Sequence, residues 1–271
     1  MARLSQRPHP DRARQDAERL LLYLLGKDKA WLMAHGDEGL PGRQADRYAE
    51  MLERRYRGEP IQYITGETEF YGLPFRVTPN VLIPRPETEH LVEKVIELAA
   101  AFKQPRIVDV GTGSGAIAVA LACEIPQAVV TSIDLSPAAL AIATENAKRN
   151  EVALRFLEGD LLTPVAGERF EIVVSNPPYV PEADRDSLSV EVRDYEPELA
   201  LFAGEEGLAI YRRLIPAARA VLVPGGFVAL EIGYGQGPVV GRLLAKSGFQ
   251  QIEFVPDLQG IPRVACGRFI P

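Results

Sequence analysis

Residues 107–116 read Ile-Val-Asp-Val-Gly-Thr-Gly-Ser-Gly-Ala, an apolar run that leads directly into a turn with three glycines. The apolar run predicts a buried strand, and the residues from Gly115 onward predict a helix. Glycine permits positive φ angles and a close approach of the backbone, and the start of a helix presents unpaired N–H groups. A strand, a glycine turn and a helix in this order predict a site where a nucleoside ligand binds.

Strands and helices alternate around this stretch. The expected strands are residues 106–110, 128–133, 153–157, 170–175, 227–232, 251–255 and 263–269, and helices are expected to begin near residues 115, 137, 208 and 238. This alternation predicts an α/β fold, a doubly wound and mostly parallel sheet with helices on both faces. No helix separates the last two strands, so we expect an antiparallel hairpin at the end of the sheet.

The N-terminal part of the chain follows other patterns. Residues 11–57 place leucines at helical spacing, whereas residues 67–84 contain short β-prone pieces between turns. Three parts are therefore expected: a small helical domain at residues 1–66, a β-hairpin linker at residues 67–84 and the sheet domain at residues 85–271. Residues 1–10 match no motif and are expected to form a flexible lead.

Charge narrows the class of protein. The net charge of the 271 residues is −7, which divides into +2 for residues 1–60 and −9 for the remainder. An acidic C-terminal part neutralises a phosphate backbone poorly, which argues against stable binding of nucleic acid. The basic run at residues 54–57 is interpreted as a solvated helix face.

No segment has the pattern of a membrane span or a signal peptide. The longest leucine-rich stretch, residues 20–25, is far too short to cross a bilayer. We therefore expect a cytoplasmic protein with no membrane partner. Cys123 and Cys266 stand apart and the three histidines are scattered, so neither a metal site nor a disulfide is expected.

Four polar residues each follow a different predicted strand: Asp109, Asp134, Asp160 and Asn176. Ligands of open α/β sheets bind outside the carboxyl ends of the strands, so these side chains are expected to face one crevice. The glycine spacing also matches the fingerprint of dinucleotide-binding proteins, with Asp134 at the usual distance of a ribose-binding acid. Both kinds of cofactor are compatible with the glycine turn alone.

Two features favour S-adenosylmethionine over a nicotinamide cofactor. Asp109, beside the glycines, suits the amino-acid end of the cofactor with its positive charge, whereas a carboxylate beside a pyrophosphate is unfavourable. Asp160 can accept a hydrogen bond from an adenine amino group, and Leu161 can pack on the ring. The predicted cofactor-binding residues are Asp109, Gly111, Thr112, Gly113, Ser114, Gly115, Asp134, Asp160, Leu161 and Asn176.

The strand at residues 170–175 ends in the turn Asn176-Pro177-Pro178-Tyr179. Consecutive prolines fix φ and supply no N–H, so the backbone carbonyls of this turn are held in place. The Asn176 side-chain carbonyl and the Pro177 carbonyl can accept both hydrogens of a planar NH₂ group, and the Tyr179 ring can cover that group. We interpret these four residues as a substrate-binding turn, with Asn176, Pro177 and Tyr179 as catalytic residues; a plain turn is the alternative when they are taken alone.

Longer segments resemble the HemK-type protein-(glutamine-N5) methyltransferases, which act on peptide chain release factors. The resemblance lies in residues 58–66 (GEPIQYITG), 82–89 (LIPRPETE), 176–180 (NPPYV), 196–201 (EPELAL) and 231–237 (EIGYGQG). It extends over nearly the whole chain. It implies the class I methyltransferase (Rossmann-like) fold, with a seven-stranded sheet whose last strand is antiparallel.

The same resemblance implies the reaction. The expected activity is transfer of a methyl group from S-adenosylmethionine to the side-chain nitrogen N5 of the glutamine in the Gly-Gly-Gln motif of bacterial-type release factors. S-adenosylhomocysteine is the product. Residues 1–66 are then expected to recognise the release factor, residues 85–271 to form the methyltransferase domain, and the protein to act as a monomer.

Three other functions remain open at this point. An adenine-N6 methyltransferase acting on DNA or RNA would use the Asn176 turn equally well, although the acidic charge argues against it. A dinucleotide-dependent oxidoreductase is supported by the glycine turn alone, and a nucleoside-binding regulatory protein has no need of the Asn176 turn. No role is assigned to Arg85, Glu87, Glu89, Glu198 and Glu231, which lie in the resembling segments.

Overall fold

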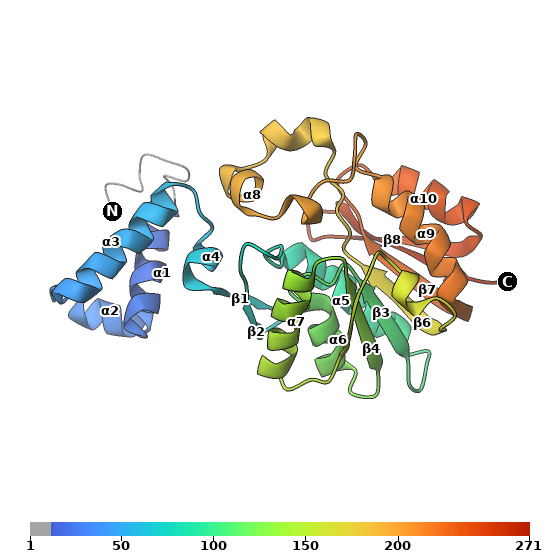
Figure 1. Ribbon diagram of the computed structural model, residues 1–271, viewed down its shortest axis with the longest axis horizontal. Coiled ribbons are helices and arrows are strands. Elements are labelled where there is room, and N and C mark those ends of the chain that lie inside the picture. The colour runs from blue at the N-terminus through green and yellow to red at the C-terminus, as the bar shows by residue number, and fades with distance from the viewer. Residues whose placement is uncertain (1–11) are drawn as a thin grey trace. The chain divides into compact units, whose positions relative to one another are not determined.

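The structure, a computed structural model, describes residues 12–271 (Figure 1). The flexible lead expected at residues 1–10 lies outside them. The chain divides into two compact units. The helical unit comprises the described residues up to Glu67 together with Leu188–Tyr195, and the sheet unit comprises Thr68–Ser187 and Glu196–Pro271. The chain therefore passes between the units three times.

The helical unit is built from short helices around a small core. It contains α1 (Ala13–Leu25), α2 (Lys29–His35), α3 (Gly42–Tyr56), α4 (Ile61–Thr65) and, from far along the chain, α8 (Val190–Tyr195). Its apolar core contains Leu20, Met51, Ile61 and Ile64. Within the described residues this core is small and provides limited hydrophobic stabilisation, which gives weight to the polar contacts of this unit.

The guanidinium of Arg55 makes buried polar contacts in the helical unit. Only 4% of the residue is exposed. Its Nε lies 2.7 Å from Asp16 Oδ2 on α1, and another of its nitrogens pairs with Glu191 on α8. The interpretation of residues 54–57 as a solvated face is therefore wrong for Arg55, because three helices bury it.

The expected β-hairpin follows the helical unit. Strands β1 (Glu67–Phe70) and β2 (Leu73–Arg76) pair with each other. The two residues between them, Tyr71 and Gly72, have φ angles of 53° and 70°, as a type I′ hairpin turn requires. Phe70 and Phe75 are buried and pack edge to face, with ring centroids 6.1 Å apart. These rings anchor the hairpin in the apolar core of the sheet unit.

The predicted seven-stranded sheet is confirmed, with the strand order β5-β4-β3-β6-β7-β9-β8. Its strands are β3 (Arg106–Val110), β4 (Val129–Asp134), β5 (Arg155–Glu158), β6 (Phe170–Ser175), β7 (Leu222–Glu231), β8 (Phe249–Pro256) and β9 (Pro262–Phe269). Only β9 runs antiparallel to its neighbours β7 and β8. Because no helix joins β8 to β9, the chain returns in the antiparallel direction, as expected.

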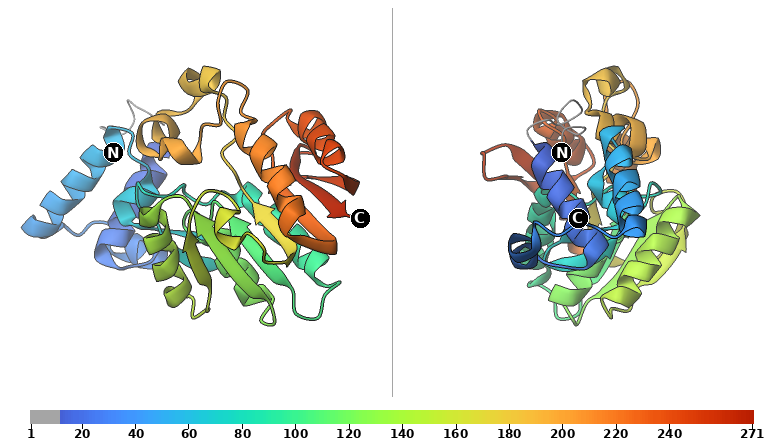
Figure 2. Two further views of the ribbon diagram at one scale, coloured as in Figure 1. Left: turned by 45° about the vertical axis from the view of Figure 1, so that its right-hand side comes forward. Right: turned by 90° about the vertical axis from the view of Figure 1, so that its left-hand side faces the viewer.

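Helices cover both faces of this sheet (Figures 1 and 2). On one face lie α5 (Glu89–Ala99), α6 (Ala116–Glu124) and α7 (Pro137–Arg149), and on the other lie α9 (Ala209–Val221) and α10 (Gly237–Lys246). Successive residues of β3 show the alternation, because Ile107 joins the cluster on the α5 and α6 face and Val108 the cluster on the α9 face. Short 3-10 helices lie in the connections: η3 (Pro86–Thr88), η4 (Thr163–Val165), η5 (Glu182–Ser187) and η6 (Glu198–Ala200). Within residues 12–271, no helix combines the length and the apolar character needed to cross a membrane.

Candidate functional site

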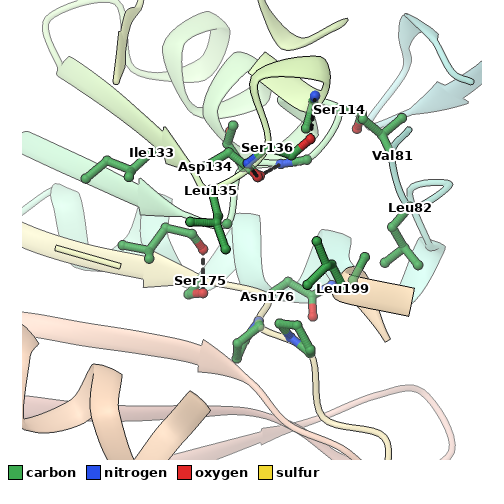
Figure 3. Close-up of a pocket in the computed structure, with 18 of the residues that line it drawn as sticks. Val81, Leu82, Ser114, Ile133, Asp134, Leu135, Ser136, Ser175, Asn176 and Leu199 are labelled. Atoms are coloured by element: carbon green, nitrogen blue, oxygen red, sulfur yellow. Dashed lines mark hydrogen bonds between the residues drawn. The ribbon is translucent and has the colours of Figure 1, made fainter. Parts of the chain in front are cut away.

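The candidate site lies at the carboxyl ends of β3, β4, β5 and β6. The chain leaves β3 toward β4 on one side and places β6 on the other, which is the switch point where such sheets bind ligands. A cavity of about 380 Å³ opens there (Figure 3). The predicted residues that line it are Gly111, Thr112, Gly113, Ser114, Asp134, Asp160, Leu161, Asn176, Pro177 and Pro178. Asp109, Gly115 and Tyr179 are not among the lining residues.

The glycine turn after β3 has the backbone conformation that the sequence predicts. Gly111, Gly113 and Gly115 have φ angles of 73°, 56° and 81°. A Cβ atom added to Gly111 or Gly113 would meet nothing within 4 Å, so the backbone is open to a ligand there. At Gly115 it would lie 3.1 Å from Ala143 Cβ, so this glycine serves the close packing of α6 against α7.

Asp134, the last residue of β4, holds the glycine turn. Its Oδ2 accepts a hydrogen bond of 2.8 Å from the Gly113 N–H, and its Oδ1 accepts one of 2.9 Å from the Ser136 N–H. Each carboxylate oxygen has a second lone pair for a ligand. Asp134 therefore has a fixed position at the cavity wall and can still accept hydrogen bonds from the hydroxyls of a bound ribose.

Asp109 lies in β3, just before the glycine turn. It is fully buried, and its Oδ2 accepts a 2.6 Å hydrogen bond from the Thr112 hydroxyl. Burial raises the pKa of Asp109 to about 7. The side chain lies under the glycine turn and not at the cavity, so its direct contact with a cofactor stays a prediction.

Asp160 and Leu161 line the cavity after β5. Leu161 has a φ of 52°, a left-handed conformation that costs an ordinary residue about 1 kcal/mol. Gly159, the residue before Asp160, must be glycine, because a Cβ there would lie 2.2 Å from Pro164 Cγ. Asp160 pairs with Arg213 of α9, a lining residue that the sequence did not point to.

The Asn176 turn is fixed from two sides. The Ser175 hydroxyl donates a 2.6 Å hydrogen bond to the Val110 carbonyl, which ties the end of β6 to β3. Asn176 Nδ2 donates to the Thr88 hydroxyl over 3.1 Å. Figure 3 shows Asn176 at the end of β6, facing the same cavity as Asp134.

Tyr179 lies behind the cavity. Its hydroxyl is 3.4 Å from Glu231 Oε1, and its carbonyl accepts a 2.9 Å hydrogen bond from Gln236 Nε2. Burial, followed by the charge of Glu231, raises the pKa of the Tyr179 hydroxyl well above its ordinary value. The expectation that this ring covers the substrate stays a prediction.

Sequence reasoning missed two segments that complete the cavity wall. Their lining residues are Asn80, Val81, Leu82, Pro84, Arg85 and Thr88, and Pro197, Leu199, Ala200 and Phe202. Figure 3 shows Val81 and Leu82 across the cavity from the strand ends, with Leu199 close to Asn176. Arg85 joins the two segments by pairing with the buried Glu196. A signal was present for those among them that lie in residues 82–89 and 196–201, because these two segments carry the family resemblance.

The lining residues suit a ligand without strong negative charge. The cations among them are Arg85 and Arg213, and each is paired with a carboxylate. Two carboxylates, those of Asp134 and Asp160, also line the cavity, so its charge suits the positively charged S-adenosylmethionine better than the negatively charged pyrophosphate of a dinucleotide. In the part of the chain that the structure describes, no three His, Cys, Asp or Glu residues gather as metal ligands.

Comparisons with known proteins agree with this chemistry. The model of the PrmC N-terminal domain matches residues 2–66, and that of the methyltransferase small domain matches residues 87–192. A release factor glutamine methyltransferase of Koribacter versatilis is 47% identical over 94% of this chain and 91% of its own length. One of Salmonella typhimurium is 44% identical over 96% and 94%. Among solved structures, the T. thermophilus 16S rRNA N2 G1207 methyltransferase (RsmC), in complex with AdoMet and guanosine, matches 75% of this chain and 49% of its own, with 20% identity and a TM-score of 0.56.

Proposed function

The chain belongs to the family of release factor glutamine methyltransferases, and from this premise we propose that it methylates the glutamine of the Gly-Gly-Gln motif in bacterial-type peptide chain release factors. It is an S-adenosylmethionine-dependent methyltransferase. The methyl group goes to the side-chain nitrogen N5 of that glutamine. The alternative, an adenine-N6 methyltransferase, is not favoured, because relatives matching over nine-tenths of their length carry the release factor name.

One observation carries the proposed site: the glycine turn and the Asn176 turn line the same cavity. When bound, S-adenosylmethionine supplies a methyl group on a positively charged sulfur and leaves as S-adenosylhomocysteine. Asp134 accepts hydrogen bonds from its ribose, and Asp160 and Leu161 bind its adenine. The carboxylate of Asp109 attracts the positively charged amino-acid end of the cofactor, and Gly115 completes the glycine turn. Together with Gly111, Thr112, Gly113 and Ser114, these residues form the proposed cofactor site.

The substrate nitrogen needs precise orientation, because the lone pair of an amide nitrogen is delocalised into its carbonyl. The turn offers no base, since the asparagine amide is neutral and proline has no side-chain acceptor. Asn176 Oδ1 and the Pro177 carbonyl accept the two amide hydrogens of the glutamine and direct its nitrogen into the cavity. Within residues 12–271 neither oxygen accepts a hydrogen bond, so both are available.

Catalysis then rests on geometry and electrostatics. Holding two reactants in the reactive arrangement contributes roughly 7–11 kcal/mol to lowering a barrier. As the glutamine nitrogen gains positive charge, its hydrogens bind the two oxygens more strongly, so the turn stabilises the transition state more than the bound substrate. The nitrogen then loses a proton to water. Pro178 keeps the turn rigid.

The remaining expectations are part of this proposal. Residues 1–66 recognise the release factor, residues 67–84 link the domains and residues 85–271 carry out the reaction; the match of a family model to residues 2–66 supports the first boundary. The enzyme works as a monomer in the cytoplasm, without a stable nucleic acid partner or a membrane.

Mass spectrometry of the substrate tests the proposal. The protein is incubated with S-adenosylmethionine and a purified release factor, which is then digested and sequenced. We expect one methyl group on the glutamine of the Gly-Gly-Gln peptide, and none on a release factor whose glutamine is replaced by alanine. Methyl transfer to adenine in DNA or RNA, with an unmodified release factor, would contradict the proposal.

A further inference from the structure

Buried side chains next to the Asn176 turn form a chain of hydrogen bonds. Asn176 Nδ2 donates to the Thr88 hydroxyl over 3.1 Å, and this hydroxyl donates to Glu231 Oε2 over 2.6 Å. The other carboxyl oxygen of Glu231, Oε1, lies 3.4 Å from the Tyr179 hydroxyl. Only 4% of Thr88 and 2% of Glu231 are exposed. These hydrogen bonds therefore connect both polar side chains of the turn, Asn176 and Tyr179, to the carboxylate of Glu231.

The fold brings these groups together from three elements. Strands β6 and β7 are parallel neighbours with Ser175 opposite Leu230. The next residues, Asn176 just after β6 and Glu231 at the end of β7, therefore lie at the same level. Thr88 comes from η3, outside the sheet, and places its hydroxyl between them. Thr88 and Glu231 are 143 residues apart in the sequence.

The Thr88 hydroxyl has a single hydrogen, and the group that accepts it sets the donor and acceptor in each of these hydrogen bonds. Above pH 7 Glu231 is ionised, and an ionised carboxylate only accepts hydrogen bonds, so this hydrogen goes to Glu231. The hydroxyl is then left with lone pairs alone and can bind Asn176 only through an N–H. The oxygen of the Asn176 amide, Oδ1, must therefore point away from Thr88. A bare asparagine amide has no such preference, because its oxygen and nitrogen ends are nearly equal in shape.

We propose that Thr88 and Glu231 are positioning residues that lock the Asn176 amide with its oxygen toward the substrate. The inference rests on the proposed role of Asn176 as an acceptor for the glutamine NH₂ group. Glu231 acts in the same way on Tyr179, whose hydroxyl it holds. Reversal of the Asn176 amide would present an N–H to the substrate N–H, and the turn would then repel the group that it must bind.

A packing role alone does not explain these residues. A buried carboxylate is costly, and apolar residues of similar volume fill such places at least as well. Burial raises the pKa of Glu231 to about 7, which reflects that cost. Thr88 is matched in shape by valine, so only its hydroxyl distinguishes it. The substitution of this hydroxyl is therefore the most selective test.

The test compares Thr88→Val with Thr88→Ser at pH 8, where Glu231 is ionised. Thr88→Val is expected to lower kcat roughly 10- to 100-fold, because the hydrogen bond that orients Asn176 is lost. The dissociation constant of S-adenosylmethionine, measured by calorimetry, should stay within about threefold of the wild-type value. Thr88→Ser keeps the hydroxyl and should restore kcat to within about threefold. Thr144→Val, which removes an exposed hydroxyl bonded to the Leu140 carbonyl on α7, is the matched control and should change nothing.

A double-mutant cycle shows whether Thr88 acts through Asn176. In an Asn176→Ala background, Thr88→Val should have no further effect on kcat, because no amide is left to orient. An equal loss in both backgrounds, or a serine variant as slow as the valine variant, would overturn the inference. A slow Asn176→Ala enzyme with a fully active Thr88→Val enzyme would refute only the inference. A fully active Asn176→Ala enzyme would refute the proposed site itself.

Discussion

Replacement of Glu231 by glutamine should change how the stability of the protein depends on pH. Burial raises the pKa of Glu231 from 4.5 to about 7, and the hydrogen bond from Thr88 and the charge of Arg263 oppose this rise only in part. Between these two pH values the folded protein keeps the proton while the unfolded chain has released it. The protonated Glu231 therefore stabilises the folded protein at low pH, and this stabilisation is lost progressively as the pH rises from 4.5 to about 7.

The pKa difference sets the size of the effect. It amounts to about 2.5 units, and each unit corresponds to about 1.36 kcal/mol, so the full effect is about 3 kcal/mol. Measurements from pH 5 to pH 8 cover most of the window and should capture about 2.5 kcal/mol. Glutamine does not titrate. The free energy of unfolding of Glu231→Gln minus that of the wild type should thus increase by this amount between pH 5 and pH 8.

Denaturant unfolding followed by circular dichroism measures this difference. The single tryptophan, Trp31, lies in the helical unit, so its fluorescence would report on the wrong part of the chain. Glu158→Gln, which changes an exposed residue of β5, is the matched control and should reproduce the wild-type pH dependence. Parallel stability curves for wild type and Glu231→Gln would refute the reasoning, since they would mean that Glu231 releases its proton at the same pH in both states.

Three further substitutions test other parts of the structure. Asp134→Asn removes the charge and one acceptor for the backbone N–H groups that it binds, so calorimetry should show S-adenosylmethionine binding weakened by roughly 10- to 100-fold. A Cβ on Gly207 would lie 2.2 Å from the Tyr179 carbonyl oxygen, so Gly207→Ala should displace the Asn176 turn and lower kcat about tenfold or more. Gly204→Ala is the control, because Gly204 also has a positive φ but its added Cβ would not clash, and it should leave kcat unchanged. Arg55→Ala leaves two carboxylates without their buried partner and should lower the free energy of unfolding of the helical unit, followed by Trp31 fluorescence, by about 3–5 kcal/mol; a loss below 1 kcal/mol would contradict the burial of this ion pair.

The sheet could be predicted closely because its strands have a clear signature. Strands buried on both faces read as continuous apolar runs, and β3 and β6 begin and end at the expected residues. The start of β7 was missed, because Pro224, Gly225 and Gly226 indicate a turn. In the structure these residues belong to an irregular first part of the strand, where the register with β6 shifts.

The candidate site was only partly predictable. Asp109 and Asp134 both stand near the end of a strand, but Asp109 lies within β3 on the same face as Ile107, under the glycine turn, whereas Asp134 ends β4 at the cavity. Sequence position alone shows that a residue is near a strand end and not which way its side chain points. The alternation along β3 contained that information and could have been used.

Contacts between distant segments could not be predicted at all. The placement of α8 with the N-terminal helices depends on a buried pair between Arg55 and Glu191. The role inferred for Glu231 depends on Thr88, and no local pattern links the two. A single sequence reports periodicity and motifs reliably, whereas pairing over such separations appears only in the folded chain.

The central claim is that the Asn176 turn orients the glutamine nitrogen and contributes little to methyl-donor binding. The most direct test measures Asn176→Ala, with methyl transfer to a purified release factor and calorimetric binding of S-adenosylmethionine on the same preparation. The loss of one of two preorganised acceptors should lower kcat by about 10²–10³-fold or more, while the dissociation constant of the donor changes less than about threefold. Near-normal kcat, or a loss of activity explained by a loss of donor binding, would contradict the account.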